Sequence, residues 1–190
     1  YFSTFDYIGN EMYGYSEFTM GNLEICRNTI NASQSGIYKN NFNYLGYNLN
    51  DNCTVIFSDF LFNDNNINTT GNNGIYVGNL NTNAYNMEEF SSVTFGNFQW
   101  NNNNISGPPS NGIYQNSLND FGYNLKNNAS VVIGNFEHSG NWMTTTSYGI
   151  HFGSLNNFGS TMYDDSNFVM DDWLMNNNTV WSDSDVFYFS

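Results

Sequence analysis

Aspartates near the carboxyl end of the sequence are its first candidates for chemistry. Carboxylates in pairs can serve as acid and base in glycoside hydrolysis, and several carboxylate oxygens together can bind Ca²⁺. The candidates are Asp164, Asp165, Asp171, Asp172, Asp183 and Asp185. They fall mostly at expected corners of the chain, where a solvated turn residue is the simpler interpretation.

The rest of the sequence gives these aspartates little support as an active site. Only three residues are basic, and polysaccharide-active enzymes often combine carboxylates with Arg or Lys. His138 and His151 lie in no Ser-His-Asp or metal-ligand spacing, and no calcium-loop motif occurs. We therefore expect no enzyme, no cofactor and at most weak Ca²⁺ binding, with Asp164, Asp165, Asp171 and Asp172 as the metal candidates.

Composition excludes several classes of protein. The chain has 190 residues, 17 of them acidic and 3 basic, which gives a formal net charge of −14. Binding of nucleic acid requires Lys and Arg to neutralise phosphates, so we expect none. The apolar runs are only strand-length, so no membrane span is expected. With 18% aromatic and 11% charged residues, the chain does not resemble a solvated disordered tail.

An internal repeat organises the whole sequence. The triplet "GIY" begins at positions 36, 74 and 112, and "GIH" at 149, so the copies lie 38, 38 and 37 residues apart. Between them stands a second phrase, as in "VIFSDF", "VTFGNF" and "VVIGNF". The period of 37–38 residues is thus a pair of similar units, each of about 18–20 residues.

Each unit has the pattern of one winding of a β-solenoid. Alternating apolar residues open it, and Gly-Asn pairs follow, which we interpret as corners with a left-handed backbone. Lys39 and Gln115 are exceptions in an otherwise apolar inward column. We predict one all-β domain over residues 1–190, with about ten coils of 18–20 residues and a length near 48 Å. Asparagines would stack in one ladder, namely Asn22, Asn41, Asn79, Asn97 and Asn135.

Neither end of the predicted solenoid has a polar capping unit. The chain begins inside a strand and ends with "VFYFS" from Val186, which opens a further coil. Either these residues belong to a longer array, or the open ends of separate subunits stack head to tail by strand addition. The residues that we assign to assembly are Tyr1, Phe2, Phe5, Val186, Phe187, Tyr188 and Phe189.

Tyrosines recur at outward positions of every second unit. Because each unit is predicted to be one coil, they form a ladder with a spacing of about 9.6 Å on a flat face. Such a face could hold glycans or pack against a neighbouring rod, or it could simply stabilise the sheet. The tyrosines are Tyr38, Tyr76, Tyr114, Tyr47, Tyr85 and Tyr123.

Two further features concern covalent chemistry. Cys26 and Cys53 lie in different columns of the repeat, so we predict free, partly buried thiols. Asn-X-Ser/Thr sequons suit N-glycosylation of a secreted protein, although a chain this rich in Asn, Ser and Thr contains several by chance. The sequons are at Asn31, Asn52, Asn68, Asn104, Asn128 and Asn177.

The phrases "IYVGNLN", "VTFGNFQ" and "VVIGNFE" resemble the β-helix repeats of secreted surface proteins and adhesins. The resemblance is one of architecture and carries no functional residue across. It implies an extracellular or cell-surface location. Our interpretation is a structural subunit of an extracellular filament, a head-to-tail homopolymer, with a glycan-binding rod and a polysaccharide-active enzyme as the alternatives.

Overall fold

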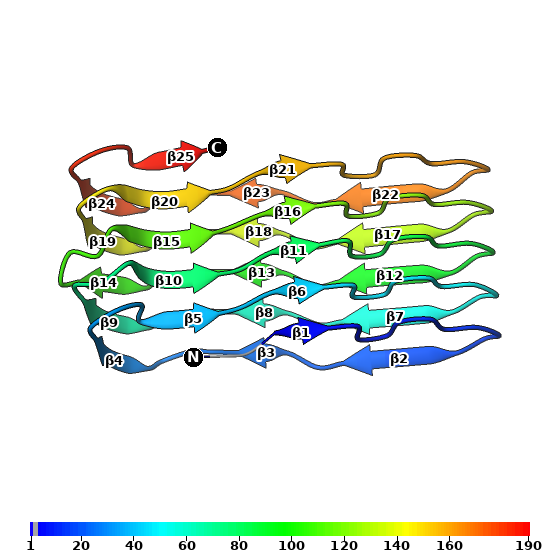
Figure 1. Cartoon of the computed structure of the whole chain (residues 1–190), viewed down its shortest axis with the longest axis horizontal. Coiled ribbons are helices and arrows are strands. Elements are labelled where there is room, and N and C mark those ends of the chain that lie inside the picture. Colours follow the sequence, from blue (N-terminus) through cyan, green and yellow to red (C-terminus); the bar gives the residue numbers. More distant parts are fainter. Residues whose placement is uncertain (2–3) are drawn as a thin grey trace.

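The structure is a computed structural model that describes residue 1 and residues 4–190. It is an all-β solenoid of about five turns, each of about 37 residues (Figure 1). In the described part of the chain, no helix is long and apolar enough to cross a membrane. The predicted fold class is therefore confirmed, but the number of coils is wrong.

Each turn contributes one strand to each of five columns, and strands pair in parallel with those of the turns above and below. The first column contains β5 (Ile37–Lys39), β10 (Asn73–Val77), β15 (Asn111–Gln115), β20 (Tyr148–Phe152) and β25 (Phe187–Phe189). The second contains β1 (Phe5–Asp6), β6 (Phe42–Asn43), β11 (Leu80–Asn81), β16 (Leu118–Asn119) and β21 (Leu155–Asn156).

The remaining three columns complete the turn, running back across the molecule in Figure 1 and then around one edge. The third contains β2 (Glu17–Met20), β7 (Thr54–Phe57), β12 (Ser92–Phe95), β17 (Ser130–Ile133) and β22 (Asn167–Met170). The fourth contains β3 (Leu23–Glu24), β8 (Phe60–Leu61), β13 (Phe98–Gln99), β18 (Phe136–Glu137) and β23 (Trp173–Leu174). The fifth contains β4 (Thr29–Ala32), β9 (Asn66–Thr69), β14 (Asn104–Ser106), β19 (Trp142–Thr145) and β24 (Thr179–Ser182).

The units of 18–20 residues are the two halves of one turn, not separate coils. Edge-to-face aromatic contacts join the two halves across the core, as between Phe42 and Phe60 at 5.3 Å and between Phe95 and Phe121 at 5.6 Å. A single unit is too short to close around such bulky inward side chains, so two units enclose them together. Five turns at about 4.8 Å make the stack about 24 Å tall rather than 48 Å.

The corner glycines have a different role from the one predicted. Gly78 and Gly96 are not in the left-handed region. A Cβ on Gly96 would lie 2.6 Å from Oδ1 of Asp59 one turn away, and a Cβ on Gly78 would lie 2.7 Å from Oδ1 of Asn41. These positions require glycine because a side chain of the adjacent turn occupies the space.

Left-handed backbone occurs at several bends of each turn, and at the far edge two consecutive residues have positive φ. The pairs are Gly14-Tyr15, Asp51-Asn52, Glu89-Phe90, Asn127-Asn128 and Asp164-Asp165. Asn and Asp tolerate this conformation better than other side chains because their short polar groups bond locally. This edge accounts for part of the abundance of Asn and Asp in the chain.

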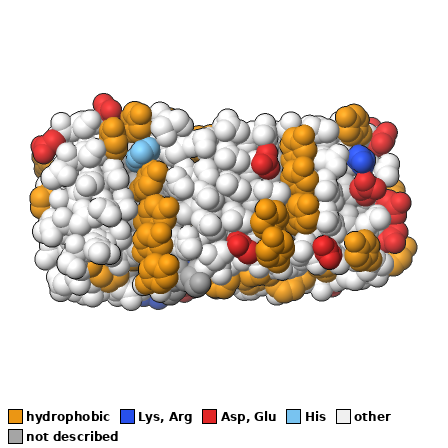
Figure 2. All heavy atoms as spheres, in the orientation of Figure 1, with side chains coloured by type: hydrophobic (Ala, Val, Ile, Leu, Met, Phe, Trp, Pro, Cys, Tyr) orange, Lys and Arg blue, Asp and Glu red, His pale blue; other side chains and the backbone are white. Residues whose placement is uncertain are grey.

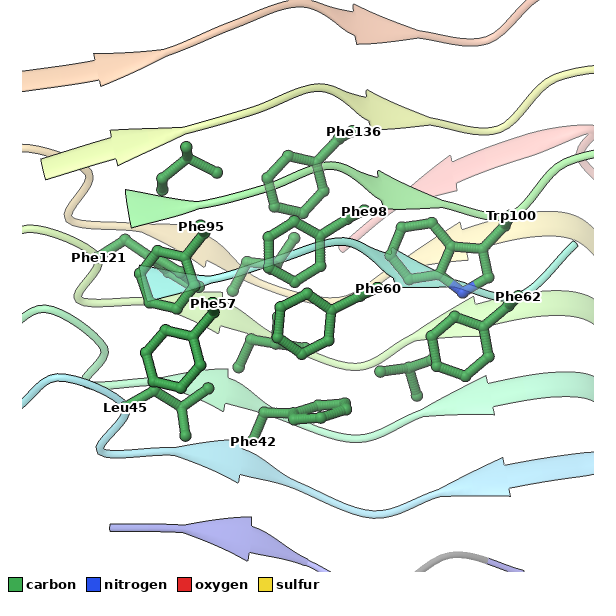
Figure 3. Close-up of a cluster of buried hydrophobic side chains, with 14 of the residues drawn as sticks. Phe42, Leu45, Phe57, Phe60, Phe62, Phe95, Phe98, Trp100, Phe121 and Phe136 are labelled. Atoms are coloured by element: carbon green, nitrogen blue, oxygen red, sulfur yellow. The ribbon is translucent and has the colours of Figure 1, made fainter. Parts of the chain in front are cut away.

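The core consists of aromatic columns that run along the stack (Figure 3). The rings of Phe60, Phe98 and Phe136 stack at centroid distances of 4.6 and 4.7 Å and lie within 6° of parallel. A second column stacks Phe62, Trp100 and His138. The predicted free thiols are confirmed: Cys53 is buried and Cys26 is half-buried.

His138 is a polar residue inside this apolar column. It is fully buried, it stacks on Trp100 at 4.5 Å, and neither ring nitrogen has a hydrogen-bond partner among the described residues. Burial lowers the pKa of His138 to about 3. The imidazole is therefore neutral in the folded protein at every pH above that value.

This burial predicts a loss of stability in acid. Below pH 6.5 the unfolded state binds a proton on His138 that the folded state excludes down to about pH 3, so unfolding becomes easier as the pH falls. Relative to the His138→Phe variant, the free energy of unfolding of the wild type should fall by about 1.4 kcal/mol for each pH unit between pH 6.5 and about pH 3. Chemical denaturation of both proteins at pH 7, 5.5 and 4.5 measures the difference, and parallel pH profiles would contradict it.

Candidate functional site: the two open ends of the stack

The two ends of the solenoid expose its interior. Inward side chains of the middle turns are completely buried, as Val93, Ile113 and Val131 are. In the first and last turns the equivalent side chains are only partly covered. Those packed against the core but partly exposed are Ile8, Met12, Phe18, Met20, Leu23, Ile30, Leu155, Phe158, Met162, Phe168, Met170, Trp173, Met175 and Val180.

The structure places the predicted assembly residues at opposite ends. Tyr1 stacks on Tyr38 at 5.0 Å, and Phe5 pairs with Phe42, so both lie at the first end. Phe187, Tyr188 and Phe189 pair with β20 at the last end. The Val186 carbonyl accepts a hydrogen bond from the backbone of Ile150. Phe2 lies outside the described residues.

A buried row of asparagines runs through the stack, and the sequence analysis missed it. We call Asn28, Asn65, Asn103, Asn141 and Asn178 the inner asparagine ladder. From Asn65 onward, the side-chain Oδ1 of each member accepts two hydrogen bonds, one from the backbone N–H and one from Nδ2 of the member one turn earlier. Both bonds from Asn65 to Asn103 are 3.0 Å long. The sequence signal was present, because these asparagines recur every 37 or 38 residues.

The inner asparagine ladder also satisfies backbone groups that the bend before it leaves unpaired. Nδ2 of Asn103 donates to the Phe62 carbonyl, and Nδ2 of Asn141 donates to the Trp100 carbonyl, at 2.8 and 2.7 Å. The middle members are at most 1% exposed. Buried polar groups this completely bonded specify one arrangement of the chain, because any displacement leaves several of them unpaired.

The predicted asparagine ladder is in fact two ladders on opposite halves of the turn. One joins Asn22, Asp59, Asn97, Asn135 and Asp172, each side chain accepting a bond from the backbone N–H of the next. The other begins with Asn41, whose Oδ1 accepts a bond from the backbone of Asn79 at 3.0 Å. The ladder is divided because residues about 18 positions apart lie on opposite halves of one turn of about 37 residues.

The tyrosines form stacks with half the expected spacing. Ring centroids lie 4.6 Å apart for Tyr38 and Tyr76, and 4.9 Å apart for Tyr85 and Tyr123, because equivalent tyrosines lie in adjacent turns. Figure 2 shows hydrophobic bands along this face, one of them ending at a histidine. Stacked rings cover one another's faces, so the bands offer mainly ring edges and hydroxyl groups. The remaining predicted members are Tyr114, next to Tyr76, and Tyr47, next to Tyr85.

The acidic candidates are not gathered into one site. Asp164 and Asp165 occupy a left-handed pair at the edge, whereas Asp171 and Asp172 follow β22 at a different corner, and all four are exposed. Among residue 1 and residues 4–190, no group of three or more His, Cys, Asp or Glu side chains could hold a metal ion.

Lys39, noted above as an exception in an apolar column, is completely buried near the first end. Its Nζ donates to the carbonyls of Asn40 and Asn41 and lies 4.1 Å from the ring centroid of Phe42. Burial lowers the pKa of Lys39 to about 8, and the nearby Asp6 carboxylate opposes this shift. The ammonium group thus has a structural role in capping carbonyls inside the corner.

All six sequon asparagines (Asn31, Asn52, Asn68, Asn104, Asn128 and Asn177) have exposed side chains. Comparison with protein-family models, with curated proteins and with solved structures finds no match to this chain.

The inner asparagine ladder predicts a large cost for breaking it in the middle. Asn103→Leu removes the acceptor for Asn65 and the donor to the Phe62 carbonyl, leaving several buried polar groups unpaired. Since each such group costs about 1–3 kcal/mol, we expect a loss of about 3 kcal/mol or more in the free energy of unfolding. Urea denaturation measures it, with the exposed neighbour Asn104→Leu as the control. Equal losses of the free energy of unfolding in the two variants would show that the inner asparagine ladder stabilises the fold no more than an exposed asparagine does.

Proposed function

We propose that this chain is a structural subunit that assembles end to end, as part of an extracellular or cell-surface filament. The observation that carries the proposal is the exposure of core-type side chains at both ends of the stack. Each end also presents strands with an unpaired edge, and such edges pair readily with further strands. A head-to-tail contact that does not close on itself produces a filament.

Other features of the surface agree with a structural role. The acidic pairs lie at separate corners, where the proposal gives them the role of solvated turn residues. The net charge of −14 keeps assembled rods from collapsing sideways onto one another. The exposed sequons are compatible with a secreted protein, which is the location that we propose.

The assembly test compares two variants of one strand. Met20 points inward at the first end and Thr19, its neighbour in β2, points outward. Met20→Glu places a carboxylate in the contact, whose burial is costly, so it should abolish polymers that the wild type forms. Thr19→Glu adds the same charge outside the contact and should leave the polymers intact.

Sedimentation velocity and electron microscopy of the dilute proteins give the readout, and circular dichroism checks that both variants remain folded. Filaments of the wild type should have an axial repeat near 24 Å, from about five turns of about 4.8 Å each. A wild type that sediments as a monomer at every concentration would contradict the proposal.

Glycan binding is the second candidate function, and one observation favours a particular location for it. Trp142 and Trp181 lie side by side on the outer surface of the fifth column, 41% and 54% exposed, with their rings at 65° to each other. Unlike the stacked tyrosines, inclined rings leave aromatic surface free for the apolar face of a sugar. Asn104 lies opposite Trp142 and Thr144 lies opposite Trp181 on adjacent strands, and their side chains supply hydrogen-bonding groups for its hydroxyls.

This second function predicts saturable quenching or enhancement of tryptophan fluorescence by neutral oligosaccharides. Trp181→Ala should reduce the affinity at least tenfold, whereas Tyr85→Ala, in a tyrosine stack, should change it less than twofold. Titrations with β-linked and α-linked glucans provide the measurement. If no oligosaccharide gives a saturable response, or if both substitutions have the same effect on the affinity, glycan binding at this site is ruled out.

A further inference from the structure

The two ends of the stack match each other in one rotational register. We infer that the first turn of a second copy docks on the last turn of the first copy, so that each residue lies above the residue whose number is 150 higher. The inner asparagine ladder selects this register. The inference rests on the proposed end-to-end assembly. It names the partner as a second copy and states which residues meet.

The spacing follows from the pairing inside the chain. Phe18 pairs with Val55, Val55 with Val93, Val93 with Val131, and Val131 with Phe168, so Phe18 and Phe168 occupy the same place four turns apart. A next turn above Phe168 would again place an apolar residue there. The first turn of another copy provides it, with Phe18 above Phe168 and Ile30 above Val180.

The inner asparagine ladder would continue through this junction without a break. Asn178 is its last member, and its Nδ2 already donates to the His138 carbonyl at 2.6 Å. In the inferred register, Asn28 of the second copy lies directly above Asn178. Its Oδ1 can accept the backbone N–H of Asn178, and its Nδ2 can reach the Met175 carbonyl. Both bonds repeat those that Asn65, Asn103 and Asn141 make inside the chain.

Charge does not oppose this register, although both ends are acidic. No acidic residue of the described first turn would lie above an acidic residue of the last turn. Glu11, Glu17 and Glu24 would lie above Thr161, Asn167 and Leu174, and Asp164, Asp165, Asp171 and Asp172 would lie below Gly14, Tyr15, Gly21 and Asn22. The direct repulsion that in-register stacking of like charges creates is thus absent.

A competing register exists because the two halves of a turn are similar. Rotation of the second copy by half a turn would still place apolar residues on apolar residues. The equivalent column of the other half reads Ile8, Leu45, Asn83, Phe121 and Phe158, however, and only Asn83 is polar in it. Asn178 would then face Ile8, and its backbone N–H would be buried without an acceptor, which disfavours that register.

One adjustment is needed at the junction. Tyr1 and Tyr188 occupy the same place in the turn, so Tyr1 of the second copy would coincide with Tyr188 of the first. Tyr1 is 86% exposed, whereas Tyr188 is half-buried and stacks on Tyr148 at 4.4 Å. Tyr1 of the second copy therefore yields its place to Tyr188, and β5 of that copy lies above β25.

Disulfide trapping tests the register. Thr29 and Thr179 are both exposed, and the inferred register places them on adjacent parallel strands, within the separation that a disulfide spans. The background is Cys26→Ser with Cys53→Ser, since Ser139 and Ser91 occupy the equivalent places in other turns. On mild oxidation, Thr29→Cys combined with Thr179→Cys should give a ladder of covalent oligomers on a denaturing gel.

The control pair reports the half-turn register. Glu11→Cys combined with Thr179→Cys places its thiols together only after a half-turn rotation, so it should remain monomeric on the same gel. Cross-linking of this control, with none from the first pair, would overturn the register while leaving end-to-end assembly intact. If sedimentation of the unoxidised background shows no association at all, the proposed function fails, and the inference fails with it.

Discussion

In-register stacking of equivalent residues is the constraint on which the rest of this structure depends. Among the described residues, each strand is hydrogen-bonded to strands one turn away, 37 or 38 residues along the chain, and to none nearer in sequence. A residue therefore meets its own equivalents above and below it. Phenylalanine stacks on phenylalanine, tyrosine on tyrosine, and asparagine on asparagine, which explains why so few residue types dominate the composition.

Asparagine meets several separate demands of this arrangement. At the edge of the turn it tolerates the left-handed backbone, as at Asn127 and Asn128. At the corners its side chain bonds the backbone of the next turn, as Asn97 does for Asn135. In the interior it pairs with both the next asparagine and a backbone carbonyl, as Asn103 does. Glycine at positions 78, 96 and 134 is a consequence, since a side-chain oxygen of the turn below lies within 2.8 Å of the place that a Cβ would take.

The same repetition leaves the ends unlike the middle. A turn inside the stack is covered on both sides, whereas the first and last turns leave aromatic and aliphatic side chains half-covered. Apolar surface of this kind favours continuation of the stack, but it carries little rotational information because the halves of the turn are alike. A buried polar row present in only one half can supply that information, because its bonds are satisfied in a single register.

The sequence by itself determined the fold class, the two-unit period and the identity of most inward residues, because period-2 alternation and the repeat of "GIY" are local signals. It also indicated two free cysteines. Only the tertiary structure decided that two units close one turn, since closure depends on how the Phe42 and Phe60 rings meet across the core. Because two units make one turn, the stack is half as tall as predicted, the tyrosine spacing is half the predicted value, and the expected asparagine ladder becomes two ladders. The inner asparagine ladder stayed hidden because its members become neighbours only when the turn length is known.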